Sequence, residues 1–389
     1  MTTYKRLGDY IREVNVRNRD EKVTNLQGVS ISKMFIPSIA NTIGTDMSTY
    51  KIVKPGQFAY GPVTSRNGDK VSIALYEDNE DSIISQAYTV FDVIDKNEVS
   101  NKYLMMWFQR PEFDRYARFH SHGSAREIFD WDELCNVMIP LPSIERQREI
   151  VEEYETLSRR ITLNEQMIQN LEATAQALYR KMFIDGIDKE NLPDGWRMGT
   201  LGEVADIKGG KRLPKGEELQ SEKNCHPYIK VADMCTHKFV MLNSSFQYVS
   251  DDVQKQIKQY IVNRDDIIIS IVGTIGNINV IDSTLDNANL TENCIKLINL
   301  KDISCNYLYS FLTSNEGQSI VNQSIVGGVQ GKLPIYNIQR IELLIPNKEY
   351  IKQFDFEMGI IDKDIKLRQK ENSKLTELQS LLLAKMGNN

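Results

Sequence analysis

Two stretches of the chain carry apolar residues at alternating steps of four and three. The first stretch comprises Ile150, Tyr154, Leu157, Ile161, Asn164, Ile168, Leu171, Ala175, Leu178 and Met182. The second comprises Phe354, Met358, Ile361, Ile365, Arg368, Asn372, Leu375, Gln379, Leu382 and Met386. This spacing is typical of a coiled-coil seam, so the pattern predicts two long helices whose apolar seam residues pack against a partner helix. A buried polar position in such a seam usually fixes the register or the partner at a cost in stability.

The two predicted helices belong to a larger internal repeat. LEATAQALYRKMF at 171–183 resembles LTELQSLLLAKMG at 375–387, and VMIPLPSIERQREIV at 137–151 resembles LLIPNKEYIKQFDF at 343–356. In the second pair an Ile-Pro ends an apolar strand, and proline stops a strand while allowing a helix to begin soon after. Weaker matches precede these: NKYLMMWF with CNYLYSFL, YKIVKPGQFAY with QYIVNRDDIII, and Leu7-Gly8-Asp9 with Leu201-Gly202-Glu203. The chain is therefore written in two similar halves.

The repeat predicts an α/β (α+β) fold with two mixed α/β domains and two long helices. We expect domain one at 1–142, helix one at 143–184, domain two at 185–346 and helix two at 347–389. The ends of a compact domain often lie close together, so helix two should run back along helix one as an antiparallel coiled coil. Helices of about 40 residues extend roughly 60 Å. We expect the two domains at opposite ends of this spacer, with a pseudo-two-fold relation between the halves.

Composition limits the class of protein. The 389 residues are enough for two or three domains, and no apolar run approaches the roughly 20 residues of a membrane span. The N-terminal sequence lacks the apolar core of a signal peptide, and the five scattered cysteines are typical of reduced thiols, so we expect a cytoplasmic protein without membrane contact. The net charge of −6 does not indicate a nucleic-acid binder, although local patches decide such binding.

Motifs for catalysis are missing or incomplete. VGGVQGKL at 326–333 resembles a phosphate-binding loop but lacks its first glycine and the final Ser or Thr. IVGTIGN at 271–277 predicts a turn between strands, and neither G-x-S-x-G nor H-E-x-x-H occurs. The histidines at 120 and 122 and the Cys/His group at 225–237 lack zinc-finger spacing. We therefore expect no catalytic residues, no metal site and no enzymatic activity in this chain.

Several short tracts are basic although each predicted domain contains slightly more acidic than basic residues. The most prominent are RYARFHSHGSAR at 115–126 and KGGKRLPKG at 208–216, with smaller tracts at 65–70 and 329–332. The glycines and the proline of 208–216 predict that this whole tract is a loop. Cations neutralise DNA phosphates, Arg and Gln contact purine edges, and glycine allows close backbone approach. Solvated surface loops are the alternative interpretation of each tract.

Together these marks resemble the specificity subunit of a type I restriction–modification system over nearly the whole chain. The local marks are I-P-L-P with E-R-Q at 139–147, Leu-Pro-Asp-Gly-Trp at 192–196 before Leu-Gly-Glu at 201–203, IKGGKRLP at 207–214 and GVSISKMFI at 28–36. The second Ile-Pro, at 345–346, lacks the following Leu-Pro and Glu. In that family each domain recognises half of a bipartite, asymmetric sequence in double-stranded DNA. The helices set the unread gap and dock two methyltransferase (M) subunits.

The resemblance also implies cofactors and candidate contacts. This chain would bind no cofactor itself, while the methyltransferase uses S-adenosylmethionine and a restriction and translocase (R) subunit uses ATP with Mg. The candidate DNA-binding residues are Arg66, Lys70, Arg115, Arg118, Arg126, Lys208, Lys211, Arg212, Lys215, Gln330 and Lys332. Two alternatives stay open. One is a coiled-coil scaffold without DNA contact, and the other is a recognition subunit of another phage-defence or methylation system.

Overall fold

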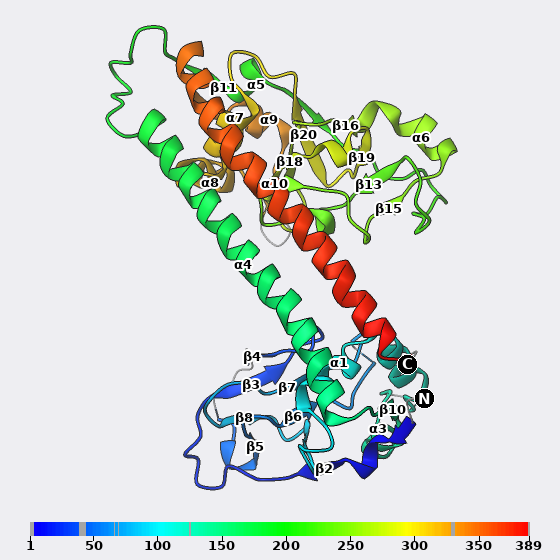
Figure 1. Ribbon diagram of the computed structural model, residues 1–389. Coiled ribbons are helices and arrows are strands. Elements are labelled where there is room, and N and C mark those ends of the chain that lie inside the picture. Colours follow the sequence, from blue (N-terminus) through cyan, green and yellow to red (C-terminus); the bar gives the residue numbers. More distant parts are fainter. Residues whose placement is uncertain are drawn as a thin grey trace. The chain divides into compact units, whose positions relative to one another are not determined.

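The computed structural model describes residues 4–38, 44–65, 67–68, 70–123, 126–327 and 331–387. These fall into two compact units, Met1–Ile161 with Lys374–Asn389 and Thr162–Ser373, called unit 1 and unit 2 below. Each unit contains one mixed α/β domain and a segment of each long helix (Figure 1). The unit limits fall inside both helices, so the four predicted domain limits stay a prediction.

The domain of unit 1 is built on two four-stranded sheets, ordered β2-β9-β6-β7 and β4-β3-β8-β5, and a separate β1-β10 pair. Its strands are β1 (Tyr4–Arg6), β2 (Ile11–Val14), β3 (Leu26–Val29), β4 (Phe35–Pro37), β5 (Lys51–Val53), β6 (Phe58–Tyr60), β7 (Ile73–Leu75), β8 (Ser82–Ile84), β9 (Thr89–Val93) and β10 (Met138–Pro140). Its helices are α1 (Asn101–Phe108), α2 (Pro111–Phe119) and α3 (Trp131–Asn136), with short 3-10 turns at Leu7–Asp9 and Met47–Thr49.

The domain of unit 2 has sheets ordered β12-β20-β17-β18-β14 and β15-β13-β19-β16, and a β11-β21 pair. Its strands are β11 (Arg197–Thr200), β12 (Asp206–Gly209), β13 (Pro227–Ile229), β14 (Phe239–Val240), β15 (Gln247–Tyr248), β16 (Ile261–Val262), β17 (Ile267–Ser270), β18 (Ile278–Ile281), β19 (Ala288–Leu290), β20 (Cys294–Ile298) and β21 (Glu342–Ile345). Its helices are α5 (Leu201–Val204), α6 (Asp251–Ile257), α7 (Cys305–Thr313), α8 (Asn315–Gln323) and α9 (Ile335–Gln339), with 3-10 turns at Val231–Asp233, Lys258–Tyr260 and Ser283–Leu285.

The strand orders confirm the internal repeat. With β14 set aside, each strand of unit 1 has a counterpart in the same chain order and the same sheet position in unit 2. The pairing directions also agree: β3 is parallel to β8 as β13 is to β19, and the remaining counterpart pairs are antiparallel. Strand β14 is the addition, and it pairs in parallel with β18. The turn predicted at 271–277 does join β17 to β18.

Both long helices begin within four residues of the repeated Ile-Pro. Helix α4 (Ile144–Phe183) follows Ser143, whose side chain accepts from the backbone N–H of Arg146 at 3.4 Å. Helix α10 (Lys348–Lys385) follows Asn347, whose side chain accepts from Tyr350 at 3.1 Å. Ser and Asn are favoured at this capping position because they satisfy amides left free in the first turn.

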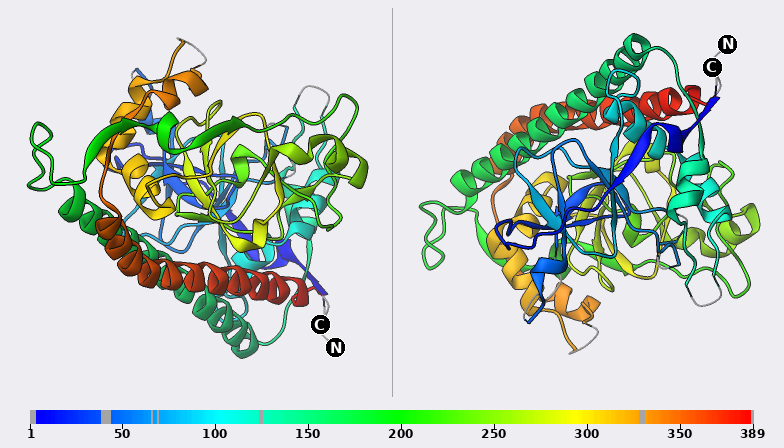
Figure 2. Two further views of the ribbon diagram at one scale, coloured as in Figure 1. Left: turned by 90° about the horizontal axis from the view of Figure 1, so that it is seen from above. Right: turned by 90° about the horizontal axis from the view of Figure 1, so that it is seen from below.

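Within each unit the segments of α4 and α10 lie side by side and run antiparallel (Figure 2). In unit 2 the Asn164 amide donates to Asn372 at 2.9 Å, while Tyr179, farther along α4, meets Phe354 near the start of α10. In unit 1 the Gln379 amide donates to Ser158 at 2.7 Å. The predicted antiparallel pairing of the two helices is therefore confirmed.

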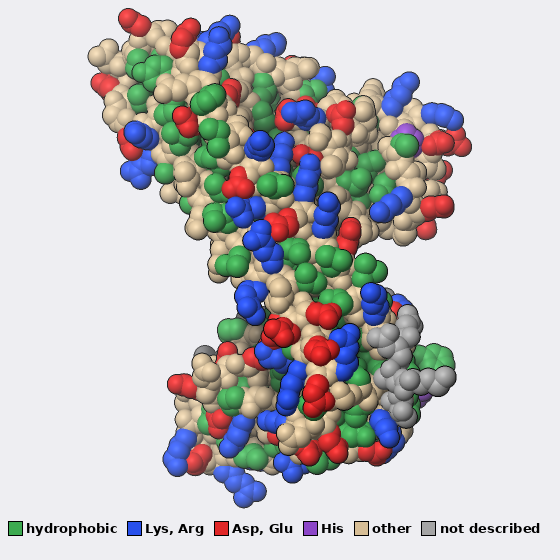
Figure 3. All heavy atoms as spheres, in the orientation of Figure 1, with side chains coloured by type: hydrophobic (Ala, Val, Ile, Leu, Met, Phe, Trp, Pro, Cys, Tyr) green, Lys and Arg blue, Asp and Glu red, His purple; other side chains and the backbone are tan. Residues whose placement is uncertain are grey.

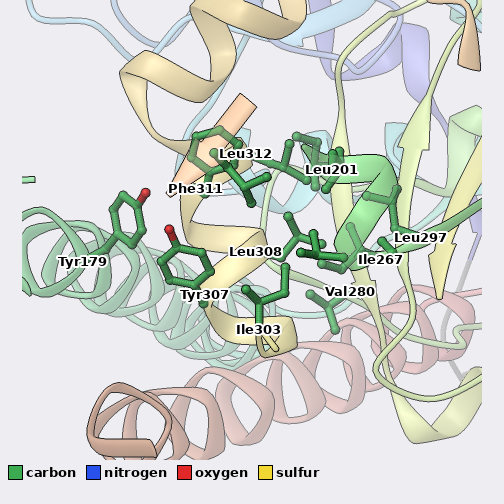
Figure 4. Packing of buried hydrophobic residues seen from close by; sticks show 14 of the residues in the cluster. Tyr179, Leu201, Ile267, Val280, Leu297, Ile303, Tyr307, Leu308, Phe311 and Leu312 are labelled. Atoms are coloured by element: carbon green, nitrogen blue, oxygen red, sulfur yellow. The ribbon is translucent and has the colours of Figure 1, made fainter. Parts of the chain in front are cut away.

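The helices also contribute to the domain cores. In unit 2 the core packs Tyr179 and Phe183 of α4 against Tyr307 of α7 and against buried strand residues (Figure 4). The buried Tyr307 hydroxyl donates to the carbonyl of Leu344 at 2.6 Å. Its repeat counterpart in unit 1, Tyr103, donates to Pro140 at 3.0 Å. Each domain is thus joined to its helix segments by continuous buried apolar surface.

Candidate nucleic-acid interface

The basic tract of domain two begins inside a strand. Lys208 and Gly209 end β12, where Lys208 lies opposite Lys296 of β20, so the expectation of a loop throughout 208–216 was wrong for these residues. Strand β12 lies at the edge of its sheet, and a long charged side chain such as that of Lys208 is common on an edge strand. A Cβ on Gly210 would lie 2.1 Å from the carbonyl oxygen of Thr291, so only glycine allows the chain to pass this close.

The loop after Gly210 has a fixed backbone and outward-facing cations. The Lys211 amide donates to Leu290, and its carbonyl accepts from the Tyr228 hydroxyl, both at 2.8 Å. The Arg212 side chain is 79% exposed and its Nε donates to Glu292 at 2.6 Å. Burial alone would raise the pKa of Glu292, but the hydrogen bond from Arg212 holds that pKa below its usual value. The two groups therefore stay charged together at the surface.

A second basic segment of domain two lies at the same end of the sheet. Val326 and Lys332 form a bridge that closes a short hairpin, and the Leu333 amide donates to Ile271. Ile271 in turn donates to Asn293, next to Glu292, and Gly210 donates to Cys294. These bonds place exposed Lys332 and the Lys211–Lys215 loop along one edge. Gln330 lies outside the described residues.

The candidates of domain one come from a helix and its following hairpin. Arg115 and Arg118 lie on α2, so the first part of this basic tract is helical. Arg115 pairs with Glu112 at 3.1 Å, and Arg118 pairs with Glu127. The hairpin closed by His122 and Ile128 matches the one closed by Val326 and Lys332.

Two more of the predicted cations of domain one, Lys70 and Arg126, lie on this hairpin or on the segment beside it. Val63 forms a bridge with Ile128, and the Thr64 amide donates to Glu127 at 3.0 Å. The segment that leads to exposed Lys70 therefore starts beside the hairpin that bears exposed Arg126. Arg66 lies outside the described residues. Of the predicted cations, the structure thus gathers those it describes into one surface region in each domain.

Two features of these regions were not predicted from the sequence. Phe119 ends α2 beside Arg118 and is 81% exposed, although a phenylalanine is usually buried. Its neighbour His120 stacks on Tyr116 with ring centroids 4.2 Å apart, which fixes the end of the helix. Glu292, which pairs with Arg212, is remote in sequence from the basic tract, and no motif indicated this pairing.

The predicted seam residues are all buried or half-buried in the structure. The seam also includes a polar layer in unit 2, where the Arg368 guanidinium donates to Asn164 at 3.1 Å and Asn164 donates to Asn372. Other apolar side chains of the long helices are exposed: Leu163, Met167, Tyr350, Phe356, Ile360, Leu367, Leu378 and Leu381. On the face shown in Figure 3, basic and acidic side chains are interspersed with such apolar ones on both units.

In the described part of the chain, no group of three or more His, Cys, Asp or Glu is arranged to hold a metal ion. His226 instead pairs with Asp251, and His237 lies between two glutamates. No helix among the residues described has both the length and the apolar character needed to cross a membrane.

Comparison with known proteins relates this architecture to one family. Residues 36–173 and 193–385 match the type I restriction modification DNA specificity domain. The chain is 22% identical to the type I restriction enzyme HindI specificity subunit of Haemophilus influenzae, over 98% of each chain. It is 24% identical to the MjaIX specificity subunit of Methanocaldococcus jannaschii, over 76% of this chain and 70% of that one.

A solved structure shares the fold. The crystal structure of the S subunit of a type I restriction-modification system from M. genitalium aligns with a TM-score of 0.54 at 16% identity, over 99% of this chain and 96% of that one. Its likeness agrees with the two repeated domains and long helices described above. The matched segments contain most of both domains and most of both helices, and the chain therefore belongs to the family of type I restriction–modification DNA specificity subunits.

Proposed function

We propose that each domain reads one half of a bipartite, asymmetric DNA sequence while the antiparallel helices set the length of the unread gap. The main support for this proposal is that the two domains share one fold but differ in their surface residues. The two domains share their strand order, yet the matching hairpins closed at His122–Ile128 and Val326–Lys332 carry different residues. Two DNA-binding domains that share a fold but carry different surface side chains suit a DNA target whose two halves differ in sequence.

The expected DNA contacts are the gathered cations. Exposed Lys and Arg displace counterions from phosphates, and Arg also fits the edge of guanine in the major groove. In domain two these are Lys208, Lys211, Arg212, Lys215 and Lys332; in domain one they are Lys70, Arg115, Arg118 and Arg126. Several of them pair with surface acids, and such exposed pairs are weak enough to be exchanged for phosphate.

We further propose that the exposed apolar residues of the long helices dock two methyltransferase subunits. In unit 2, Phe356 and Ile360 are exposed on α10; in unit 1, Leu378 and Leu381 are exposed on the same helix. A groove of about 700 Å³ in unit 1 is lined by Glu149, Glu152, Glu153, Thr156, Leu157, Leu378, Leu381, Leu382 and Lys385. Exposed apolar surface of this kind is typical of protein interfaces.

In this proposal the chain is not itself catalytic and works in the cytoplasm. The docked subunits would supply methyl transfer from S-adenosylmethionine, and restriction subunits would add cleavage driven by ATP with Mg. The role of the chain is then to choose the DNA site at which its partners act.

The DNA-binding part is tested by gel shift of the chain in complex with its methyltransferase. The logarithm of affinity should fall linearly with the logarithm of salt concentration, because each phosphate contact releases a counterion. A complex that assembles but shifts no duplex that carries the genomic methylation site would refute the proposal and favour a protein scaffold.

The docking part is tested by the double variant Phe356→Ser with Ile360→Ser. We expect the mass of the purified complex to fall by one methyltransferase subunit, since one of two docking surfaces is lost. Tyr336→Ser removes an exposed aromatic from α9 and is the matched control. An unchanged mass for the double variant would place the docking surface elsewhere.

A further inference from the structure

One hairpin of unit 2 has a much longer connection than its counterpart in unit 1. In unit 1 the antiparallel strands β3 and β4 are joined by residues 30–34, whereas their counterparts β13 and β15 are joined by residues 230–246. This longer connection contains β14, which has no counterpart among the described residues of unit 1 and adds to the edge of the sheet beside β18. We call residues 235–240 of this connection the clamp.

The clamp contacts α4 through a histidine between two carboxylates. His237 Nε2 lies 2.6 Å from Oε2 of Glu165, and Nδ1 lies 3.5 Å from Oε2 of Glu172. The next backbone amide, of Lys238, donates to Oε1 of Glu172 at 2.7 Å. The two glutamates are seven residues apart and so lie on one face of the helix, with the histidine side chain only 14% exposed.

The same clamp contacts α10 through a buried lysine. Lys238 is 1% exposed, and its ammonium donates to Asp362 at 2.7 and 2.9 Å and to Asn306 of α7 at 2.6 Å. Farther along α10, the Gln369 amide donates to the carbonyl of Phe239 at 3.0 Å. Two adjacent residues, His237 and Lys238, therefore join domain two to both long helices.

A third contact extends the clamp along α10. The Lys366 ammonium lies 4.1 Å from the centroid of the Phe239 ring and 3.4 Å from Asp282, which follows β18. A buried charge is tolerated only with close partners, so each of these pairs has one favourable arrangement. Apolar surfaces alone lack this directional demand, because they gain free energy from area with little dependence on angle.

Domain one provides the contrast. Its short connection also carries a buried lysine, Lys33, which pairs with Asp114 of α2 at 2.8 Å and with the carbonyl of Phe108. Both partners belong to the domain itself. The buried lysine of the matching hairpin thus bonds inward in domain one and to a long helix in domain two.

From this contrast we infer that the clamp is a positioning element that fixes the direction of domain two on the α4–α10 pair, so that the complex accepts a single gap length. The inference rests on the proposed function, because it concerns how the gap between half-sites is held constant. His237 and Lys238 act here as positioning residues and are not among the proposed DNA contacts.

The test is a spacer-selectivity assay on the complex of chain and methyltransferase. The wild-type target is first read from methylated adenines in cells that express both proteins. Plasmids then carry the two half-sites with the natural gap or with one base pair more or less. The ratio of methylation rates between the natural and altered gaps measures how firmly the readers are positioned.

The main variant combines Lys238→Met with Asp362→Leu. Replacement of both members of a buried pair by apolar residues commonly preserves stability, whereas removal of one leaves an unpaired buried charge. We expect the spacer selectivity to fall at least tenfold while the half-site sequences stay the same. The matched control, Lys33→Met with Asp114→Leu, should leave spacer selectivity unchanged whatever it does to overall affinity.

The outcomes separate the inference from the proposed function. Wild-type selectivity in a folded double variant overturns the positioning role and leaves bipartite reading intact. A wild-type complex that methylates no bipartite target overturns the proposed function. If the double variant does not assemble, His237→Gln and His237→Lys decide: loss of selectivity in Gln with rescue by Lys supports the inference, and equal selectivity in both overturns it.

Discussion

The pairing of His237 with two glutamates makes the stability of unit 2 depend on pH. Hydrogen bonds to Glu172 and Glu165 outweigh the effect of burial and raise the pKa of His237 to about 9. The pKa of a histidine in an unfolded chain is about 6.5. The folded state therefore holds this proton more tightly, and protonation favours folding across the interval between the two values.

The size of the effect follows from that difference. A rise from about 6.5 to about 9, at 1.36 kcal/mol per pKa unit, corresponds to about 3 kcal/mol of stability. Because the folded-state pKa is raised, this contribution is fully present below about pH 6.5 and disappears as the pH rises through about 9. His237→Gln should therefore destabilise the chain by up to about 3 kcal/mol at pH 6, and by much less at pH 10.

Two measurements check this prediction. Histidine ¹³C NMR resolves the titration of each of the four imidazoles, and His237→Gln identifies the one to assign. Urea unfolding of wild type and variant between pH 6 and 10 gives the difference in free energy. An imidazole that titrates near 6.5, or a free-energy difference independent of pH, would refute the assignment of a doubly paired histidinium.

Three further predictions concern the seam, the core and the basic loop. Asn164→Ala removes the donor to the Oδ1 atom of buried Asn372 and the acceptor of the Arg368 guanidinium, and should cost about 1–3 kcal/mol in thermal unfolding; an unchanged melting temperature would contradict a role for the polar layer. Phe354→Ala removes a fully buried ring and should cost about 3–5 kcal/mol, measured by the same unfolding assay. Lys211→Ala with Arg212→Ala should reduce the slope of log affinity against log salt by up to about 2 and leave the complex assembled; loss of assembly would make that loop structural.

The sequence predicted those parts of the fold that repeat or follow a short period. The four-three spacing from Ile150 and from Phe354 marked both long helices, because one face of each must be apolar to pack. The repeated Ile-Pro marked their starts, which the structure places after the caps Ser143 and Asn347. The antiparallel pairing followed from chain order alone, since a compact domain separates the two helices.

Other features had no local pattern. Strand β14 and the clamp depend on contacts between residues such as His237, Glu172 and Asp362, which are distant in sequence and share no spacing rule. The acid-free tract indicated Arg212 as a surface cation. Its partner Glu292 is positioned by the start of the neighbouring strand β20, which no local pattern predicts. The exposure of Phe119 could not be predicted either, because an aromatic residue at the end of an amphipathic helix is usually buried.

The central claim, that the paired helices hold two unlike DNA readers at a fixed spacing, is tested most directly by mapping methylated adenines. The map should be compared between wild type and a variant with one extra helical turn in both α4 and α10. Wild type should methylate a motif of two different halves with a constant gap. The variant should keep both halves and lengthen the gap by roughly 1–2 base pairs, from 5.4 Å per turn against 3.4 Å per base pair. A continuous motif in wild type, or the same gap in both proteins, would contradict the account.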